Sequence, residues 1–174
     1  MNYNLKRFKD AHDRSYRVAL EEIRNWKKDS HWMWYIFPQI EWLWNSSTSK
    51  KYAIKWIWEA KAYLKDKELR SHLIESLLAL LDLKENISED IFWKVDALKL
   101  HSCLTLFHQV EPDNEIFNSV LEKFYNWELD LKTLSILGIL WEEMQWRLDT
   151  KIRPEKYEIK NINELKEFTK KKKK

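Results

Sequence analysis

The stretch Lys67–Leu83 reads KELRSHLIESLLALLDL, and its pattern decides the fold class. Large aliphatic residues recur three or four positions apart, which places them on one side of an α-helix. They are Leu69, Leu73, Ile74, Leu77, Leu80 and Leu81. The spacing predicts a long amphipathic helix packed against a core.

Helical patterns also dominate the sequence on both sides of this stretch. We expect Asp13 to cap a helix at 14–25 and Asp96 to cap one at 97–110. Further helices are predicted at 59–65, 115–125 and, from Asp130 onward, 131–148. Strand signals are scarce. The prediction is therefore a single compact all-α domain with short irregular segments over 1–150, followed by a C-terminal extension at 151–174 with a Lys-rich tail.

Composition restricts the compartment and the partners. The 174 residues are 44% hydrophobic and 34% charged, with one cysteine, Cys103, so no internal disulfide framework can form. This cysteine usage is typical of the reducing cytosol, and no apolar run approaches the ~20 residues of a membrane span. We therefore expect a cytoplasmic protein without membrane contact.

The charge distribution argues against a nucleic-acid-binding domain. The net charge is +3, but Lys170–Lys174 supply five positive charges, so the rest of the chain is slightly acidic. A nucleic-acid-binding domain usually carries a basic patch within its fold. Nucleic acid is thus an unlikely partner, except through weak contact with the terminal lysines.

The numbers of tryptophan and glycine are both unusual. The chain has eleven Trp and one Gly, whereas an average protein of this length has about twelve glycines at ~7%. Several Trp also occupy turn positions, for example after Asn25 and Asn126, where glycine is favoured. One hypothesis is that UGA codons, which some bacterial lineages read as glycine, are read here as tryptophan. The alternative is a genuinely Trp-rich protein.

Two motifs resemble the domain of unknown function 1810 family. They are KDSHWMWYIFPQ at 28–39 and DALKLHSCLTLF at 96–107, and the likeness covers about residues 5–137. The resemblance implies a mainly helical fold and no established activity. Trp26, Trp42, Trp44, Trp93 and Trp127 fall where the family pattern resembles glycine, and His101 falls where it tends to have arginine.

The same two motifs contain the polar and aromatic residues of a candidate pocket. The first motif supplies Lys28, Ser30, His31, Trp34 and Gln39, and the second supplies Asp96, Lys99, Ser102 and Thr105. Lysines and hydroxyls can bind an anion, and a tryptophan can stack on a planar ring. We expect a small anionic or nucleotide-like ligand, with His31 as the candidate catalytic acid or base.

An alternative interpretation assigns both motifs a structural role. The aromatic residues would then fill the core, Asp96 would cap a helix, and the protein would be a non-catalytic interaction or regulatory module. Whether the protein is an enzyme stays open at this point, and so does any cofactor. The five histidines show no spacing that predicts a metal site.

Overall fold

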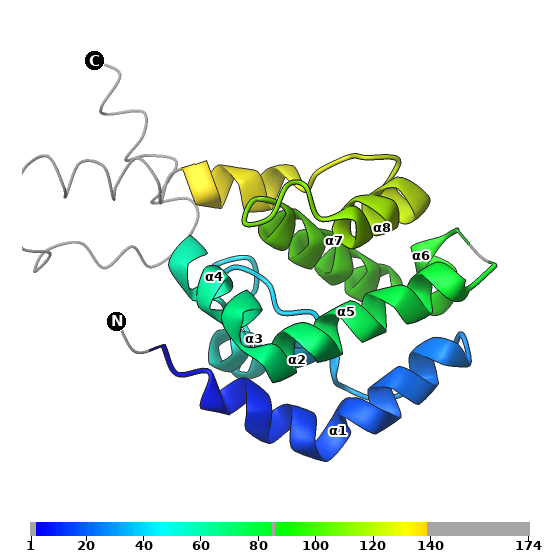
Figure 1. Cartoon of the computed structure of the whole chain (residues 1–174), viewed down its shortest axis with the longest axis horizontal. Coiled ribbons are helices and arrows are strands. Elements are labelled where there is room, and N and C mark those ends of the chain that lie inside the picture. Colours follow the sequence, from blue (N-terminus) through cyan, green and yellow to red (C-terminus); the bar gives the residue numbers. More distant parts are fainter. Residues whose placement is uncertain (1–2, 85, 139–174) are drawn as a thin grey trace, which may run out of the picture.

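The computed structural model describes residues 3–84 and 86–138, which form a helical domain (Figure 1). Its helices are α1 (Lys6–Arg24), α2 (Met33–Ile36), α3 (Ser47–Tyr52), α4 (Ile57–Lys65), α5 (Lys67–Asp82), α6 (Ser88–Ile91), α7 (Lys94–His108) and α8 (Glu115–Tyr125). A further helical segment covers 131–138. The predicted all-α class is confirmed, since none of these described residues forms a β-strand.

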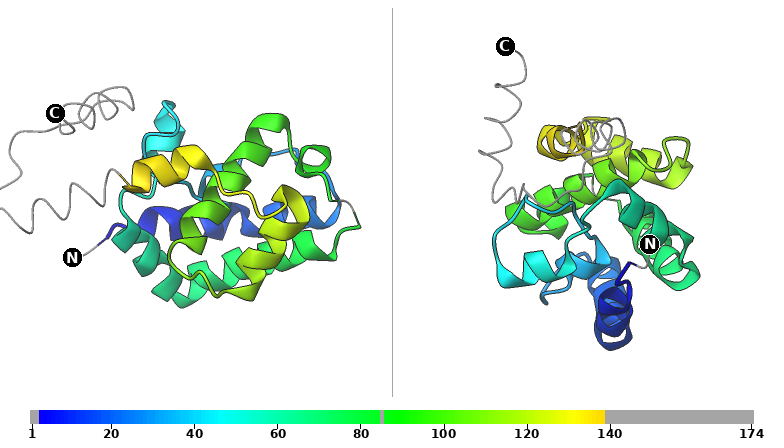
Figure 2. Two further views of the ribbon diagram at one scale, coloured as in Figure 1. Left: turned by 90° about the horizontal axis from the view of Figure 1, so that it is seen from above. Right: turned by 90° about the vertical axis from the view of Figure 1, so that its left-hand side faces the viewer.

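Helix α5 is central to the packing. It contacts α1 on one side and α8 on the other, and α8 packs in turn on α7 (Figures 1 and 2). The aliphatic stripe predicted from the sequence makes these contacts, and Leu69, Leu73, Leu77 and Leu80 are fully buried. Burial of each such side chain is worth about 1.5–3 kcal/mol, so this stripe is a major source of stability.

Helix α1 is one continuous helix, and the predicted cap at Asp13 was wrong. Asp13 lies exposed in the middle of the helix. Phe8, Ala11 and His12 before it and Tyr16 after it are all buried, so the apolar face continues through this position. An acidic residue on the outer face of a helix has the same sequence appearance as an N-cap.

The aromatic stretch after α1 contains the single helical turn α2. Trp32, Met33 and Phe37 are buried, so the core contains most of this stretch. The chain then passes through one isolated parallel bridge between Ile40 and Ile54. Between these two residues lie an irregular segment and α3, whose first turn is capped by the Ser46 side chain accepting from the Ser49 N–H.

Helix α7 begins two residues before Asp96, so the predicted N-cap at Asp96 was also wrong. Trp93 is the N-cap residue, and Asp96 lies in the first helical turn. Its carboxylate is therefore available for partners other than the backbone. Asp130 does cap the 131–138 segment, because its Oδ2 accepts the Thr133 N–H at 3.1 Å.

Some sequence predictions concern residues outside the described part of the chain. These are the continuation of the last helix to 148, the 151–174 extension and Lys170–Lys174. Within residues 3–84 and 86–138, no helix combines the length and apolarity needed to cross a membrane.

Candidate functional site

Lys28, Asp96 and Lys99 form a buried ion triad between the loop after α1 and the first turns of α7. The Asp96 carboxylate contacts Lys28 Nζ through Oδ2 at 2.7 Å and Lys99 Nζ through Oδ1 at 2.6 Å. Each lysine side chain is only 8% exposed, and the Asp96 side chain is 14% exposed. The two sequence motifs thus meet at this carboxylate.

The triad carries an excess of positive charge. Within the described residues, Asp96 is the only carboxylate that forms an ion pair with either lysine. Burial opposes ionisation of Asp96, but hydrogen bonds from Lys28 and then Lys99 outweigh it and lower the pKa of Asp96 below its ordinary value. Two ammonium groups therefore share one carboxylate charge, and buried charges are costly unless they are compensated.

Aromatic rings cover this triad. Lys99 Nζ lies 3.8 Å from the centroid of the Trp34 ring and 5.5 Å from that of Trp44, and Lys28 Nζ lies 5.2 Å from that of Trp32. Trp34 and Trp44 meet edge to face, with centroids 6.0 Å apart. The π faces partly compensate the ammonium charges, but a cation–π contact does not supply a full negative charge.

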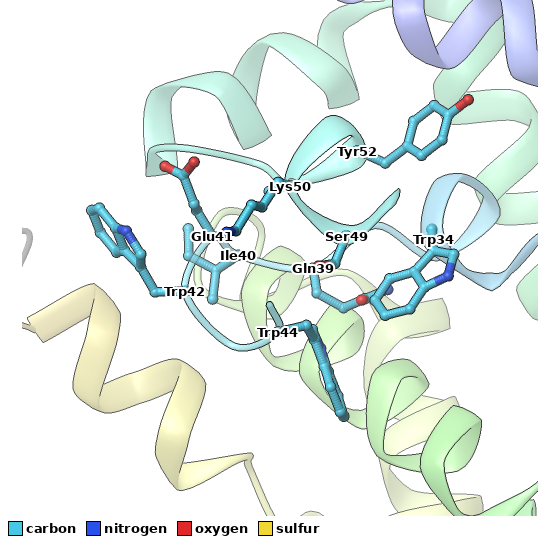
Figure 3. A pocket seen from close by; sticks show the side chains of 10 residues that line it. Trp34, Gln39, Ile40, Glu41, Trp42, Trp44, Ser49, Lys50 and Tyr52 are labelled. Atoms are coloured by element: carbon cyan, nitrogen blue, oxygen red, sulfur yellow. The ribbon is translucent and has the colours of Figure 1, made fainter. Parts of the chain in front are cut away.

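A shallow pocket adjoins the two rings (Figure 3). Its enclosed part holds about one water molecule. The Gln39 side chain extends toward Trp34, whereas Trp42 points away from it (Figure 3). The lining residues are Trp34, Gln39, Ile40, Glu41, Trp42, Trp44, Ser49, Lys50, Tyr52 and Ala53. Lys99 does not line this pocket, but its Nζ lies near the rings of two lining residues, Trp34 and Trp44.

Ser30 contacts both the triad and α1, because its carbonyl accepts from Lys28 Nζ at 2.7 Å while its other polar groups bond to Glu22. Its backbone N–H and its hydroxyl both donate to the Glu22 carboxylate. The same carboxylate accepts from the Asp29 N–H at 2.9 Å and from Trp32 Nε1 at 2.7 Å. Glu22 thereby fixes the loop that carries Lys28. Sequence reasoning missed Glu22, because it is one of several acidic residues in α1.

Ser102 and Thr105 hold the segment that begins at Asp130. The single Ser102 hydroxyl proton is shared between two acceptors, Asp130 Oδ2 at 2.9 Å and the Leu98 carbonyl at 3.0 Å from Oγ. The Thr105 hydroxyl donates to the His101 carbonyl at 2.9 Å and accepts the Asp130 N–H at 2.9 Å. Both hydroxyls are thus occupied in packing between α7 and the 131–138 segment.

His31 and Gln39 differ in their relation to the pocket. Gln39 lines it, is 4% exposed, and donates through Nε2 to the Phe37 carbonyl. His31 is exposed and does not line it. The contacts therefore join Lys28, Asp96 and Lys99 in the triad and place Trp34 next to Lys99 and in the lining of the pocket that Gln39 also lines, whereas His31 is not in that lining.

Three tryptophans have a left-handed backbone. Among the described residues, the non-glycine positions with positive φ are Trp26 at 57°, Trp42 at 73°, Asn126 at 49° and Trp127 at 66°. Asparagine visits this region readily, but a bulky residue there is a genuine outlier. The remaining two Trp that fall on glycine-like positions do not share the feature: Trp93 has φ −62°, and Trp44 is absent from the positive set.

Two histidines form a pair of titratable side chains away from the triad. His12 on α1 and His72 on α5 share a hydrogen bond between their Nδ1 atoms at 2.9 Å, and His12 Nε2 lies 2.8 Å from the Tyr35 carbonyl. Burial lowers the pKa of His12 to about 4. In the described part of the chain, no third His, Cys or carboxylate completes a metal-binding group here.

Comparison with known proteins gives a family and one structural relative. The sequence matches the family described as "Protein of unknown function (DUF1810)" over residues 2–137. The fold resembles the crystal structure of the conserved hypothetical protein Rv1873 from Mycobacterium tuberculosis, with a TM-score of 0.76 and 36% identity. The match covers 78% of this chain and 97% of that one. No functionally curated protein matches the sequence.

Proposed function

The chain belongs to the DUF1810 family, whose description assigns no activity, and from the geometry of its site we propose that it binds a small anionic or nucleotide-like molecule beside Trp34. The observation that carries the proposal is the Lys28–Asp96–Lys99 triad, in which two buried ammonium groups share one carboxylate. An anionic ligand would supply the missing negative charge through charge-assisted hydrogen bonds.

The proposal concerns binding and not catalysis by His31. The His31 side chain is exposed and is not among the residues that line the pocket, so the proposal assigns it no role. Ser102 and Thr105 likewise have structural partners. The ligand-binding set is therefore Lys28, Trp34, Gln39, Asp96 and Lys99.

Calorimetric titration with inorganic phosphate and with adenosine 5′-monophosphate tests this function. We expect the unchanged chain to bind at least one of them, and Lys99→Gln to weaken that binding by about tenfold or more, because the positive charge beside the Trp34 ring is lost. Lys65→Gln removes an exposed lysine on α4 and serves as the matched control. Binding that is unaffected by Lys99→Gln, or no binding of either compound, would contradict the proposal.

A second candidate function is a protein-interaction module. Val95 and Leu98 lie three positions apart on α7 and are 51% and 50% exposed, and the adjacent Trp93 is 80% exposed. Exposed apolar residues on one helix face are typical of interaction surfaces. This candidate predicts that Leu98→Glu changes the sedimentation coefficient of the protein, and an unchanged sedimentation coefficient would contradict it.

We also propose that positions 26, 42 and 127 are glycine in the protein as its source organism makes it. Their left-handed backbone supports this, because glycine adopts that conformation without steric cost. The backbone gives no such support at Trp93. UGG codons at these three positions in the coding DNA would refute the proposal, and peptide mass spectrometry of the natural protein checks it directly.

A location in the cytosol is a further proposal, supported by the single, buried Cys103.

A further inference from the structure

The indole of Trp44 lines the shallow pocket and also lies near the ion triad. Its ring contacts Trp34 edge to face and lies near Lys99 Nζ, and its backbone belongs to the irregular segment between Ile40 and α3. Figure 3 shows the Trp34 and Trp44 side chains flanking the same space, with Gln39 between them. The indole thus lies both in the pocket lining and beside Lys99.

Polar complementarity at this position is poor. Among residues 3–84 and 86–138, no hydrogen-bond partner is found for the buried Trp44 Nε1, whereas the buried N–H of Trp32 donates to Glu22. Buried N–H groups in native proteins nearly always have a partner. The surroundings therefore accommodate the shape of an aromatic ring and place a cation beside it, but they do not satisfy the polar atom of an indole.

We propose that the Trp44 indole occupies a slot for the planar ring of an aromatic anion, the chemical class to which nucleoside monophosphates belong. This inference rests on the proposed function and deepens it. The ring of the ligand packs against Trp34, as bases do on aromatic side chains. Its negative group lies on the side of Lys99, the triad lysine that is near the Trp44 ring. The Gln39 amide lies at the edge of the ring.

The proposal requires a ring and an anion in the same ligand, and three probes separate these requirements. Adenosine 5′-monophosphate carries both, adenosine carries the ring alone, and inorganic phosphate carries the anion alone. Trp44→Gly removes the indole from a partly exposed, irregular segment, so the variant keeps the helical core. Trp127→Gly also removes an indole, from the turn after α8, and serves as the matched control.

Calorimetric titration of the variants with each probe tests the inference. We expect Trp44→Gly to tighten binding of adenosine 5′-monophosphate and adenosine by about tenfold relative to the unchanged chain, whereas Trp127→Gly leaves both affinities unchanged. Adding Lys99→Gln to Trp44→Gly should weaken binding of the monophosphate but not of adenosine. Circular dichroism confirms that each variant is folded.

The outcomes distinguish the two proposals. If phosphate binds in a Lys99-dependent way but Trp44→Gly gives no gain with either ring-bearing probe, the aromatic slot is refuted and the anion site stands. If no probe binds to either chain, both are refuted. Equal gains from Trp44→Gly and Trp127→Gly would also overturn the inference, because the effect would then not belong to this slot.

Discussion

Replacing Trp127 with glycine should stabilise the protein. Trp127 has φ 66° and directly follows Asn126, which is also left-handed, so two consecutive residues hold this conformation at the end of α8. The Trp127 N–H donates to the Leu121 carbonyl at 3.2 Å, and this hydrogen bond requires the turn. The backbone conformation is thus fixed by the helix end, and the side chain must tolerate it.

The magnitude follows from two opposing terms. A left-handed conformation costs an L-residue about 1–2 kcal/mol, and glycine avoids this cost. Glycine also loses about 0.5–1 kcal/mol more backbone entropy on folding. Trp127 is 51% exposed, so its loss also removes some packing and offsets part of this gain. We expect a net gain of at most about 1 kcal/mol, and a melting temperature raised by about 2–4 °C per kcal/mol.

Urea unfolding followed by circular dichroism measures this gain without depending on tryptophan fluorescence. Trp127→Ala is the decisive control, because alanine removes the indole but retains the Cβ that causes the strain. Trp93→Gly removes an indole that is 80% exposed at a position with φ −62°, and it should give no gain. If Trp127→Ala stabilises as much as Trp127→Gly, or if Trp127→Gly destabilises, the reasoning from backbone strain is refuted.

The remaining predictions concern two buried polar contacts. The pKa of His12 is about 4 in the folded protein and about 6.5 in the unfolded chain. Between these pH values the unfolded chain binds more protons than the folded protein. The free energy of unfolding therefore falls as the pH decreases from 6.5 to 4, by at most about 3 kcal/mol. Urea unfolding at several pH values checks this, and an equally steep profile in His12→Asn would contradict it. Arg7 Nη2 contacts Glu59 Oε1 at 2.8 Å, and Glu59 is 2% exposed, so Arg7→Met should destabilise by about 3 kcal/mol. If the Arg7→Met, Glu59→Leu double variant loses less stability than the sum of the two single variants, the ion pair is supported. Additive losses of stability would argue against it.

Local periodicity was sufficient for much of the fold. The 115–125 helix has the predicted bounds, because its apolar stripe and the preceding Asn114 cap lie within one short segment. The failures at Asp13 and Asp96 share a cause. An acidic residue before an apolar stripe satisfies the N-cap pattern, but packing of the preceding residues decides where the helix begins. In α1 that packing comes from Phe8 and Ala11.

The candidate site depends on contacts between distant parts of the sequence. Lys28 and Asp96 belong to separate motifs, and their ion pair follows from the packing of the α1 loop on α7. The sequence pattern could identify the polar residues on α7, but it could not separate Lys99, which contacts Trp34, from Ser102, which contacts Asp130. The two residues can be distinguished only once it is known which part of the structure packs against each side of α7.

The bridge between Ile40 and Ile54 has a consequence for engineering. The Glu41 N–H donates to the Ile54 carbonyl and the Ile54 N–H donates to the Gln39 carbonyl, each at 2.9 Å. These bonds clamp the two ends of the intervening segment together, as in an Ω-loop. A segment with tied ends can be exchanged as a cassette while its anchor points stay in place. Residues 41–53, which include Trp42 and Trp44, are therefore the natural unit for grafting new specificity onto this helical scaffold.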